Sequence, residues 1–206
     1  MKIARFIAII LPLMLLGLTA RAAEPSAKAT IDKVVNALRS HPSVDVKFSV
    51  NAGGATTSGS LSMAGKCFWL NTPQMQVWYD GKTQWSYAPS QKEVNVTEPT
   101  AAEIAEVNPL AVLSNLDKNY TFRRLKAAAG EERIEIVPRR PTSDFRKALL
   151  VVNKSTSMPT RLVVYADGNS TTSVSITSVK PGKKKPVAAY RFDPKKYRGV
   201  EVVDLR

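Results

Sequence analysis

The sequence predicts a mainly β protein with a few short helices, arranged as an antiparallel sandwich or barrel. Three observations predict this class. Apolar and polar residues alternate in about eleven short segments, which is typical of half-buried strands. Turn dipeptides such as Asp80-Gly81 and Asp167-Gly168 separate several of these segments. Helical spacing of apolar residues occurs only near residues 27–39 and 100–116.

The first 22 residues have the features of a cleaved secretory signal peptide. Lys2 and Arg5 precede a short apolar run, Phe6 to Leu18, and Ala20-Arg21-Ala22 fits a small-x-small cleavage site. The alternative is a membrane anchor, but this run is shorter than the ~20 residues that a spanning helix needs. We therefore expect an exported protein in which residues 23–206 form one domain.

The chain is strongly basic, with a formal charge of +13, or +10 after loss of the three basic residues of the signal peptide. Such a surface favours anionic partners, and export argues against nucleic acid. The densest basic run is KPGKKKP, Lys180 to Pro186. A solvated loop that aids solubility is the alternative explanation of this run.

Residues 27–39 predict an amphipathic helix that ends before His41-Pro42. The period then changes to two, which predicts a strand with Val46 and Phe48 on its apolar face. Two further strands follow around a turn near Gly65. Their inward residues are Leu61 and Met63 in the first, and Phe68 and Leu70 in the second.

The stretch MQVWYDGKTQWSYAP, Met75 to Pro89, predicts a hairpin. A two-residue loop would mix apolar and polar residues on both faces, so we predict a three-residue loop, Tyr79 to Gly81. In that register, one apolar face carries Met75, Val77, Trp85 and Tyr87. Trp78 then lies on the polar face, and the register gives no reason for it.

After a strand at KEVNVTE, TAAE (Thr100 to Glu103) predicts a capping box. Asn108-Pro109 starts a second helical stretch with Leu110 and Leu113. The remaining predicted strands are NYTFRRL, ERIEIVP, KALLVVN, TRLVVYA, TSVSITSV, AAYRF and GVEVVDL. A curved sheet this wide exceeds the eight strands or so whose inward side chains fill a barrel, so the helices should cover its concave side. Either an apolar cavity or a solid apolar core would result.

No catalytic or metal-binding pattern is evident. His41 is the single histidine. Cys67 is the single cysteine, and an isolated cysteine is more often a buried packing residue than a reactive thiol. No Cys/His metal spacing and no phosphate-binding glycine motif occurs. We therefore expect no enzyme activity and no cofactor, with a carboxylate-only hydrolase as the alternative.

A family resemblance is carried by YDGKTQWSYAPSQKEVNV, Tyr79 to Val96. Around it, in order, stand KFSV, GSLSM, NPLAVLSN and the closing YRGVEVVDLR. With this order and spacing, the chain resembles a divergent member of the outer-membrane lipoprotein carrier family, LolA. The resemblance covers essentially the whole chain after the signal peptide.

The resemblance implies an incomplete antiparallel barrel closed by a helical lid, with a cavity for acyl chains. It implies a monomeric periplasmic chaperone that takes triacylated lipoproteins from an inner-membrane ABC transporter to an outer-membrane acceptor. By position, the residues that would line the sheet side are Val46, Phe48, Leu61, Met63, Phe68, Leu70, Val77 and Trp85. Those on the helix side are Leu110 and Leu113.

Well-studied members of the family carry an arginine just after the strand matching GSLSM, where this chain has Ala64-Gly65-Lys66. A lysine is a point charge rather than a planar fork, so lid control should differ. The alternative function is a periplasmic module that senses a lipid or lipoprotein with the same half-barrel. Such regulators usually carry a second domain, for which this sequence leaves no residues.

Overall fold

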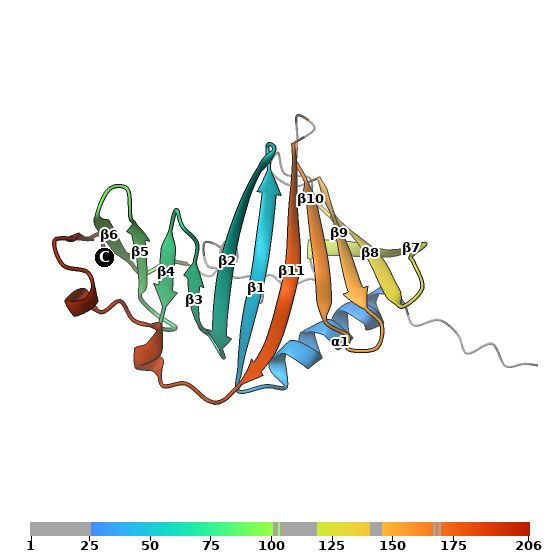
Figure 1. Cartoon of the computed structure of the whole chain (residues 1–206). Coiled ribbons are helices and arrows are strands. Elements are labelled where there is room, and N and C mark those ends of the chain that lie inside the picture. Colours follow the sequence, from blue (N-terminus) through green and yellow to red (C-terminus); the bar gives the residue numbers. More distant parts are fainter. Residues whose placement is uncertain (1–25, 101–102, 104–118, 141–145, 167, 169) are drawn as a thin grey trace, which may run out of the picture.

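Twelve strands form one open sheet in the computed structural model, which describes residues 26–100, 103, 119–140, 146–166, 168 and 170–206. The strand order is β12-β6-β5-β4-β3-β2-β1-β11-β10-β9-β8-β7, and the two edge strands do not pair with each other (Figure 1). The expected incomplete barrel is therefore confirmed. The elements are α1 (Ala27–Arg39), β1 (Ser43–Ala52), β2 (Ala55–Ala64), β3 (Cys67–Asn71), β4 (Gln76–Tyr79), β5 (Gln84–Ala88), β6 (Glu93–Thr97), β7 (Tyr120–Leu125), β8 (Glu131–Pro138), β9 (Lys147–Asn153), β10 (Pro159–Tyr165), β11 (Thr171–Gly182) and β12 (Glu201–Asp204).

Two antiparallel meanders meet at the centre of the sheet. One runs from β1 to β6 and the other from β7 to β11, and β1 pairs with β11 along its length. A register shift between Lys47 and Phe48 bends this central pair. The predicted helices after Glu103, with Leu110 and Leu113, lie outside the described residues, as does the signal peptide. The predicted capping box is present, since Thr100 N–H donates to Glu103 Oε2 at 2.7 Å.

Helix α1 spans the predicted residues 27–39 and lies against the half of the sheet that contains β7 to β11 (Figure 1). Ser26 caps its N-terminus by accepting the Ala29 N–H at 3.1 Å. One stripe of the helix is buried, consisting of Thr30, Ile31, Val34, Val35 and Leu38. This stripe packs on Ile134 and Leu150 of the sheet, so the helix owes its place to apolar burial.

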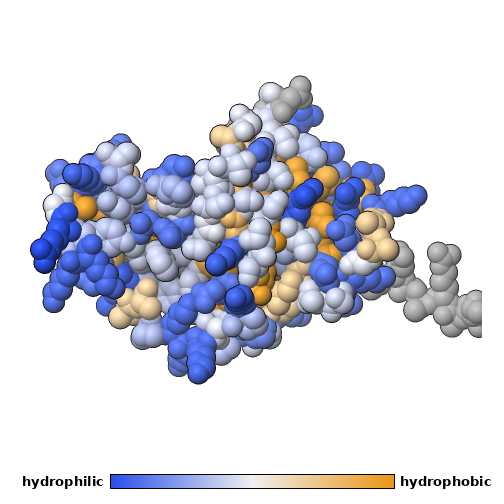
Figure 2. Space-filling model, viewed as in Figure 1, coloured by the Kyte–Doolittle hydropathy of each residue, from blue (hydrophilic) through white to orange (hydrophobic). Residues whose placement is uncertain are grey.

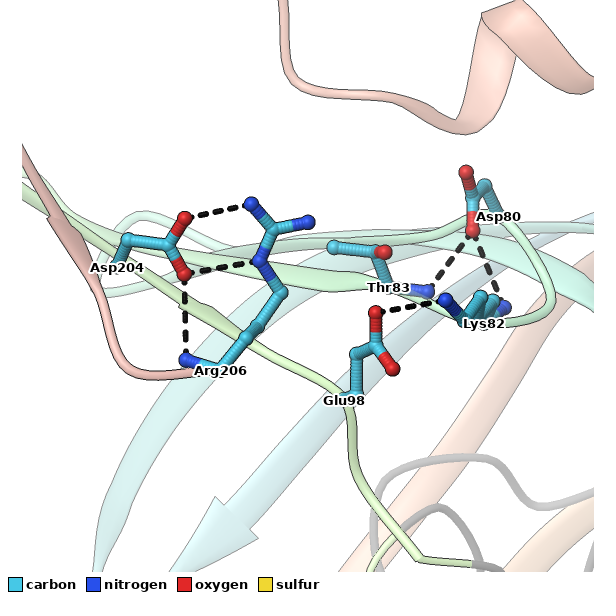
Figure 3. A network of polar contacts seen from close by, with 6 residues as sticks. All are labelled: Asp80, Lys82, Thr83, Glu98, Asp204 and Arg206. Carbon is cyan, nitrogen blue, oxygen red and sulfur yellow. Dashed lines mark hydrogen bonds and ion pairs between the residues drawn. The ribbon is translucent and has the colours of Figure 1, made fainter.

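The turn between β4 and β5 shows that the predicted register is wrong. Trp78 pairs with Trp85, and a four-residue loop, Asp80 to Thr83, connects the strands. The Asp80 carboxylate accepts the Lys82 N–H at 3.1 Å and the Thr83 N–H at 2.9 Å, which fixes this longer loop (Figure 3). Trp85 therefore does not share a face with Val77, and neither does Tyr87, which pairs with Gln76.

An aromatic layer on the outer face of the sheet explains this register. Trp69, Trp78 and Trp85 pair in one row across β3, β4 and β5. Phe192 and Tyr197, from the segment after β11, pack edge-on against Trp78 with ring centroids 5.5 Å away. Trp78 is consequently only 5% exposed. Side chains on both faces of these strands are at least half-buried, so the separation of apolar from polar residues does not identify the register.

The segment between β11 and β12, residues 183–200, forms a strap over this outer face (Figure 1). Lys185 Nζ bonds Asp45 at 2.7 Å, and Arg191 Nε donates to Asp80 Oδ2 at 2.8 Å. The predicted strand AAYRF is wrong, because Val187–Tyr190 is a 3₁₀ helix whose Tyr190 is buried. Hydrophilic side chains gather over the strap at the lower left of Figure 2.

Strand β12 follows the strap and pairs with β6 in parallel, the one parallel pairing in the described sheet. The Leu205 N–H donates to Val96 O at 2.9 Å. This pairing covers the edge of β6, which would otherwise offer unpaired backbone groups.

We expect Gly59→Ala to lower the free energy of unfolding by about 1 to 3 kcal/mol, because overpacking strains a closely packed sheet. A Cβ atom at Gly59 would lie 2.6 Å from Phe48 Cζ and 2.9 Å from the backbone oxygen of Asn71. The Phe48 ring is the far end of a side chain and can shift, whereas the Asn71 oxygen belongs to the backbone of a paired strand. Urea unfolding followed by tryptophan fluorescence measures the effect. Ser58→Ala, at the exposed neighbouring position, is the control, and an equal loss in both variants would contradict this packing.

A second prediction concerns acid stability. Burial by itself would raise the pKa of Asp80, but hydrogen bonds from Thr83 N–H, Arg191 and Lys82 N–H hold it below its ordinary value. The ionised carboxylate therefore stabilises the fold above a pH of about 4, and this contribution is lost as the pH falls through the lowered pKa. We expect Asp80→Asn to cost about 1 to 3 kcal/mol at pH 7. Near pH 3, the free energy of unfolding of this variant should differ less from that of the unmodified protein.

Urea unfolding at both pH values measures this dependence. Asp32→Asn is the matched control, because the Asp32–Lys28 pair is exposed on α1 and contributes little. A loss for Asp80→Asn that is the same at pH 7 and pH 3 would contradict the role of the carboxylate charge.

Candidate functional site

The inner face of the sheet, on the side of α1, is lined by apolar side chains. Alternation along each strand and direct pairing between strands place two rows of residues across β1 to β4. The first row is Val44, Met63, Phe68 and Tyr79, and the second is Val46, Leu61, Leu70 and Val77. The rings of Phe68 and Tyr79 lie 5.5 Å apart within the first row.

The β7–β11 half continues the same apolar surface. Its buried inward residues are Ile134, Ile136, Ala148, Leu150 and Val152, which form one cluster with α1 and with the two rows. Half-buried side chains surround this cluster, namely Tyr120, Phe122, Leu162, Val164 and Val179. The inner face is thus a continuous apolar surface over β1 to β4 and β7 to β11.

Burial divides this surface into two parts. Phe68 and Val77 are at most 1% exposed and belong to the closed core. Val46 and Leu70 of the second row are only half-buried, as is Phe48 on the same face. Half-buried side chains have apolar area still to be covered, so they are the part of the face that is available to an apolar ligand.

The predicted lining residues fall into three groups. Those that share the inner face are Val46, Phe48, Leu61, Met63, Phe68, Leu70 and Val77. Trp85 and Tyr87 lie on the outer face beneath the strap, and Met75 precedes β4 with 38% of its surface exposed. The predicted shared face of Met75, Val77, Trp85 and Tyr87 is therefore wrong. Leu110 and Leu113 lie outside the described residues.

A buried polar cluster joins α1 to the sheet. Thr30, in the apolar stripe of α1, donates its hydroxyl to the Glu132 carboxylate of β8. Arg124 Nη2, from β7, donates to Thr30 Oγ1 at 2.9 Å and lies 3.4 Å from Glu132 Oε2. Thr30 is 2% exposed and Glu132 8%. The cluster fixes the position of α1, since moving the helix would uncover a charged pair in an apolar surrounding.

Metal binding and nucleophilic catalysis would each require particular groups among the described residues. No group of three or more metal-ligating side chains occurs in the part of the chain that the structure describes. On the opposite, outer face, burial raises the pKa of the Cys67 thiol and the Asp80 charge acts in the same direction, so this thiol is not activated as a nucleophile. None of the described helices is long and apolar enough to cross a bilayer.

The family assignment follows from a sequence comparison. The model of the family described as "Outer membrane lipoprotein carrier protein LolA" matches residues 16–166, well over half of the chain. The chain belongs to the LolA family. The resemblance carried by Tyr79 to Val96 is thereby confirmed. A comparison with curated proteins found no match.

Solved structures share the fold of this LolA-family protein at low sequence identity. An uncharacterized conserved protein from Thermus thermophilus matches with a TM-score of 0.59 and 11% identity, over 86% of this chain and 98% of that one. The Pseudomonas aeruginosa MucA/MucB complex matches with a TM-score of 0.50 and 14% identity, over 82% of this chain and 62% of that one. These similarities establish the common architecture.

Sequence reasoning missed two features of this LolA-family site. The predicted three-residue loop contains Tyr79, whereas this residue lies in β4 and belongs to an inward row. The cluster of Thr30, Arg124 and Glu132 joins residues about a hundred positions apart, and no local pattern predicts it. Lys66, which stands where the family arginine was sought, is exposed in the turn between β2 and β3.

We expect Glu132→Leu to destabilise the protein by about 3 to 5 kcal/mol, because it removes the carboxylate that accepts from the buried Thr30 hydroxyl and pairs with Arg124. The double variant Glu132→Leu with Arg124→Met should recover much of this loss, since apolar side chains of similar volume then fill the site. Urea unfolding of both single variants and the double variant measures the coupling. Simple additivity of the two single losses would contradict a coupled pair.

Proposed function

We propose that this protein is a periplasmic carrier that binds the acyl chains of lipoproteins on the inner face of its sheet and takes them from the inner to the outer membrane. The observation that supports this most directly is the continuous apolar inner face, which includes half-buried residues such as Val46, Phe48 and Leu70. Membership of the LolA family supports the same function. In this proposal residues 23–206 act as one exported unit after removal of the signal peptide.

The energetics of acyl binding fit this proposal without any catalytic group. Each CH₂ removed from water contributes ~0.8 kcal/mol, so a chain of about sixteen carbons gains roughly 10 kcal/mol. The free-energy cost of opening the apolar surface must offset part of that gain. A ligand bound with the full ~10 kcal/mol would not dissociate at its destination. Carriage therefore requires a surface that is partly closed when empty, as the half-buried residues provide.

The proposed partners follow from the same role. They are triacylated lipoproteins as cargo, an inner-membrane lipoprotein-releasing ABC transporter as donor and an outer-membrane acceptor, with the carrier acting as a monomer. A second candidate is a regulatory module that senses a lipid or lipoprotein with the same half-barrel. The fold shared with MucB, solved in complex with MucA, favours keeping it as an alternative.

Release of lipoproteins from spheroplasts, together with native mass spectrometry of the periplasmic protein, tests carriage. We expect bound acylated peptide or lipoprotein in the purified protein and release of lipoproteins when it is added. Protein that is always empty and releases nothing would overturn the carrier. Binding of an acylated ligand without release would favour the sensing module.

A matched pair of variants tests the binding face. Val46→Asn places an amide on the half-buried inner surface and should weaken binding of an alkyl fluorescent probe about tenfold, because burying an unpaired polar group costs ~1 to 3 kcal/mol. Lys47→Asn changes the exposed neighbouring residue on the outer face and should have no such effect. Equal affinities of the two folded variants would show that the inner face does not bind the probe.

A further inference from the structure

The inner face changes from apolar to polar at one end. The row that contains Phe68 and Tyr79 continues into Gln84 of β5 and Thr97 of β6. The row that contains Leu70 and Val77 continues into Ser86 and Asn95. The same surface that is apolar over β1 to β4 therefore ends in amides and hydroxyls over β5 and β6.

These polar side chains are not an ordinary solvated edge. Gln84, Ser86, Asn95 and Thr97 are all half-buried. Gln84 Nε2 donates to Ser86 Oγ at 3.1 Å, whereas Gln84 Oε1 is shut off from solvent and has no hydrogen-bond partner among the described residues. A buried carbonyl without a donor costs free energy that a ligand donor would recover.

The charge of this polar end limits what it can bind. The inward positions of β5 and β6, two fully described strands, hold no lysine or arginine. Asn95 Nδ2 donates to Glu93 Oε1 at 2.7 Å, so the charge among these inward positions is negative. The nearby Lys82 is exposed and pairs with Glu98 at 3.0 Å. A phosphate or a free carboxylate would therefore find no unpaired cation at the inward positions of β5 and β6, whereas neutral esters, amides and hydroxyls match the donors and acceptors that are present there.

We propose that Gln84, Ser86, Asn95 and Thr97 form the subsite for the polar head of the acylated ligand. The head is a neutral group that carries ester or amide bonds, such as the acylglyceryl and acyl-amide end of an acylated peptide. This inference rests on the proposed function, since it places the acyl chains on the adjacent apolar rows. The amide N–H groups of the ligand donate to Gln84 Oε1, and its ester and amide carbonyl groups accept from the hydroxyls of Ser86 and Thr97.

Binding of two probes with equal acyl chains tests the subsite. One probe is an N-acyl dipeptide amide, which has the neutral head, and the other is a fluorescent hydrocarbon chain without a polar head. We expect Gln84→Leu with Asn95→Leu to weaken binding of the dipeptide amide tenfold or more and to leave the hydrocarbon probe within twofold of the unmodified protein. Ser86→Ala, which adds no bulk, should weaken only the dipeptide amide, about threefold.

The control is Gln74→Leu with Asn51→Leu, the same two changes at exposed positions. If the unmodified protein binds neither probe, the proposed function itself fails. If the unmodified protein binds both probes, the variants decide on the head subsite. Variants that bind both probes as well as the unmodified protein does, or that bind both equally weakly, would overturn the head subsite and leave acyl binding unaffected. Tighter binding of the free fatty acid than of the dipeptide amide would also overturn it.

Discussion

The register of β4 on its neighbours is the constraint on which the rest of this half of the sheet depends. Because side chains alternate between faces, placing Trp78 outward places Val77 and Tyr79 inward. The aromatic row of Trp69, Trp78 and Trp85 is held outward by the rings of the strap, so the strap indirectly decides which residues line the inner face. A slip of β4 by one residue would turn Trp78 and the polar Gln76 to the inner face and Val77 and Tyr79 to the outer face.

The two meanders of the sheet are stabilised in different ways. In the β7–β11 half, α1 buries the inner face with its apolar stripe and is fixed by the cluster of Thr30, Arg124 and Glu132. In the β3–β6 half, the strap buries the outer face. Between these two supports the inner face keeps half-buried apolar residues such as Val46, Phe48 and Leu70. Such residues suit the proposed uptake and release of an acyl chain.

The gradient along the inner face gives a physical reason for ligand orientation. Apolar burial by itself has no direction, so a purely apolar surface would accept an acyl chain either way round. Neutral hydrogen-bonding groups at one end favour a ligand whose polar head lies there. The same groups would disfavour long runs of hydrocarbon, because Gln84 and Asn95 would then lose hydrogen bonds.

The sequence by itself determined helix α1, most strands, the capping box and the family, because each depends on residues close together in the chain. Seven of the proposed lining residues, from Val46 to Val77, were also placed on the correct face, since period-two alternation within one strand is enough for that. Tertiary structure decided the hairpin register, the face of Trp85 and Tyr87, and the 3₁₀ helix at AAYRF. Each of these depends on the strap, whose rings lie about a hundred residues away from β4 and bury a second face that local alternation does not reveal.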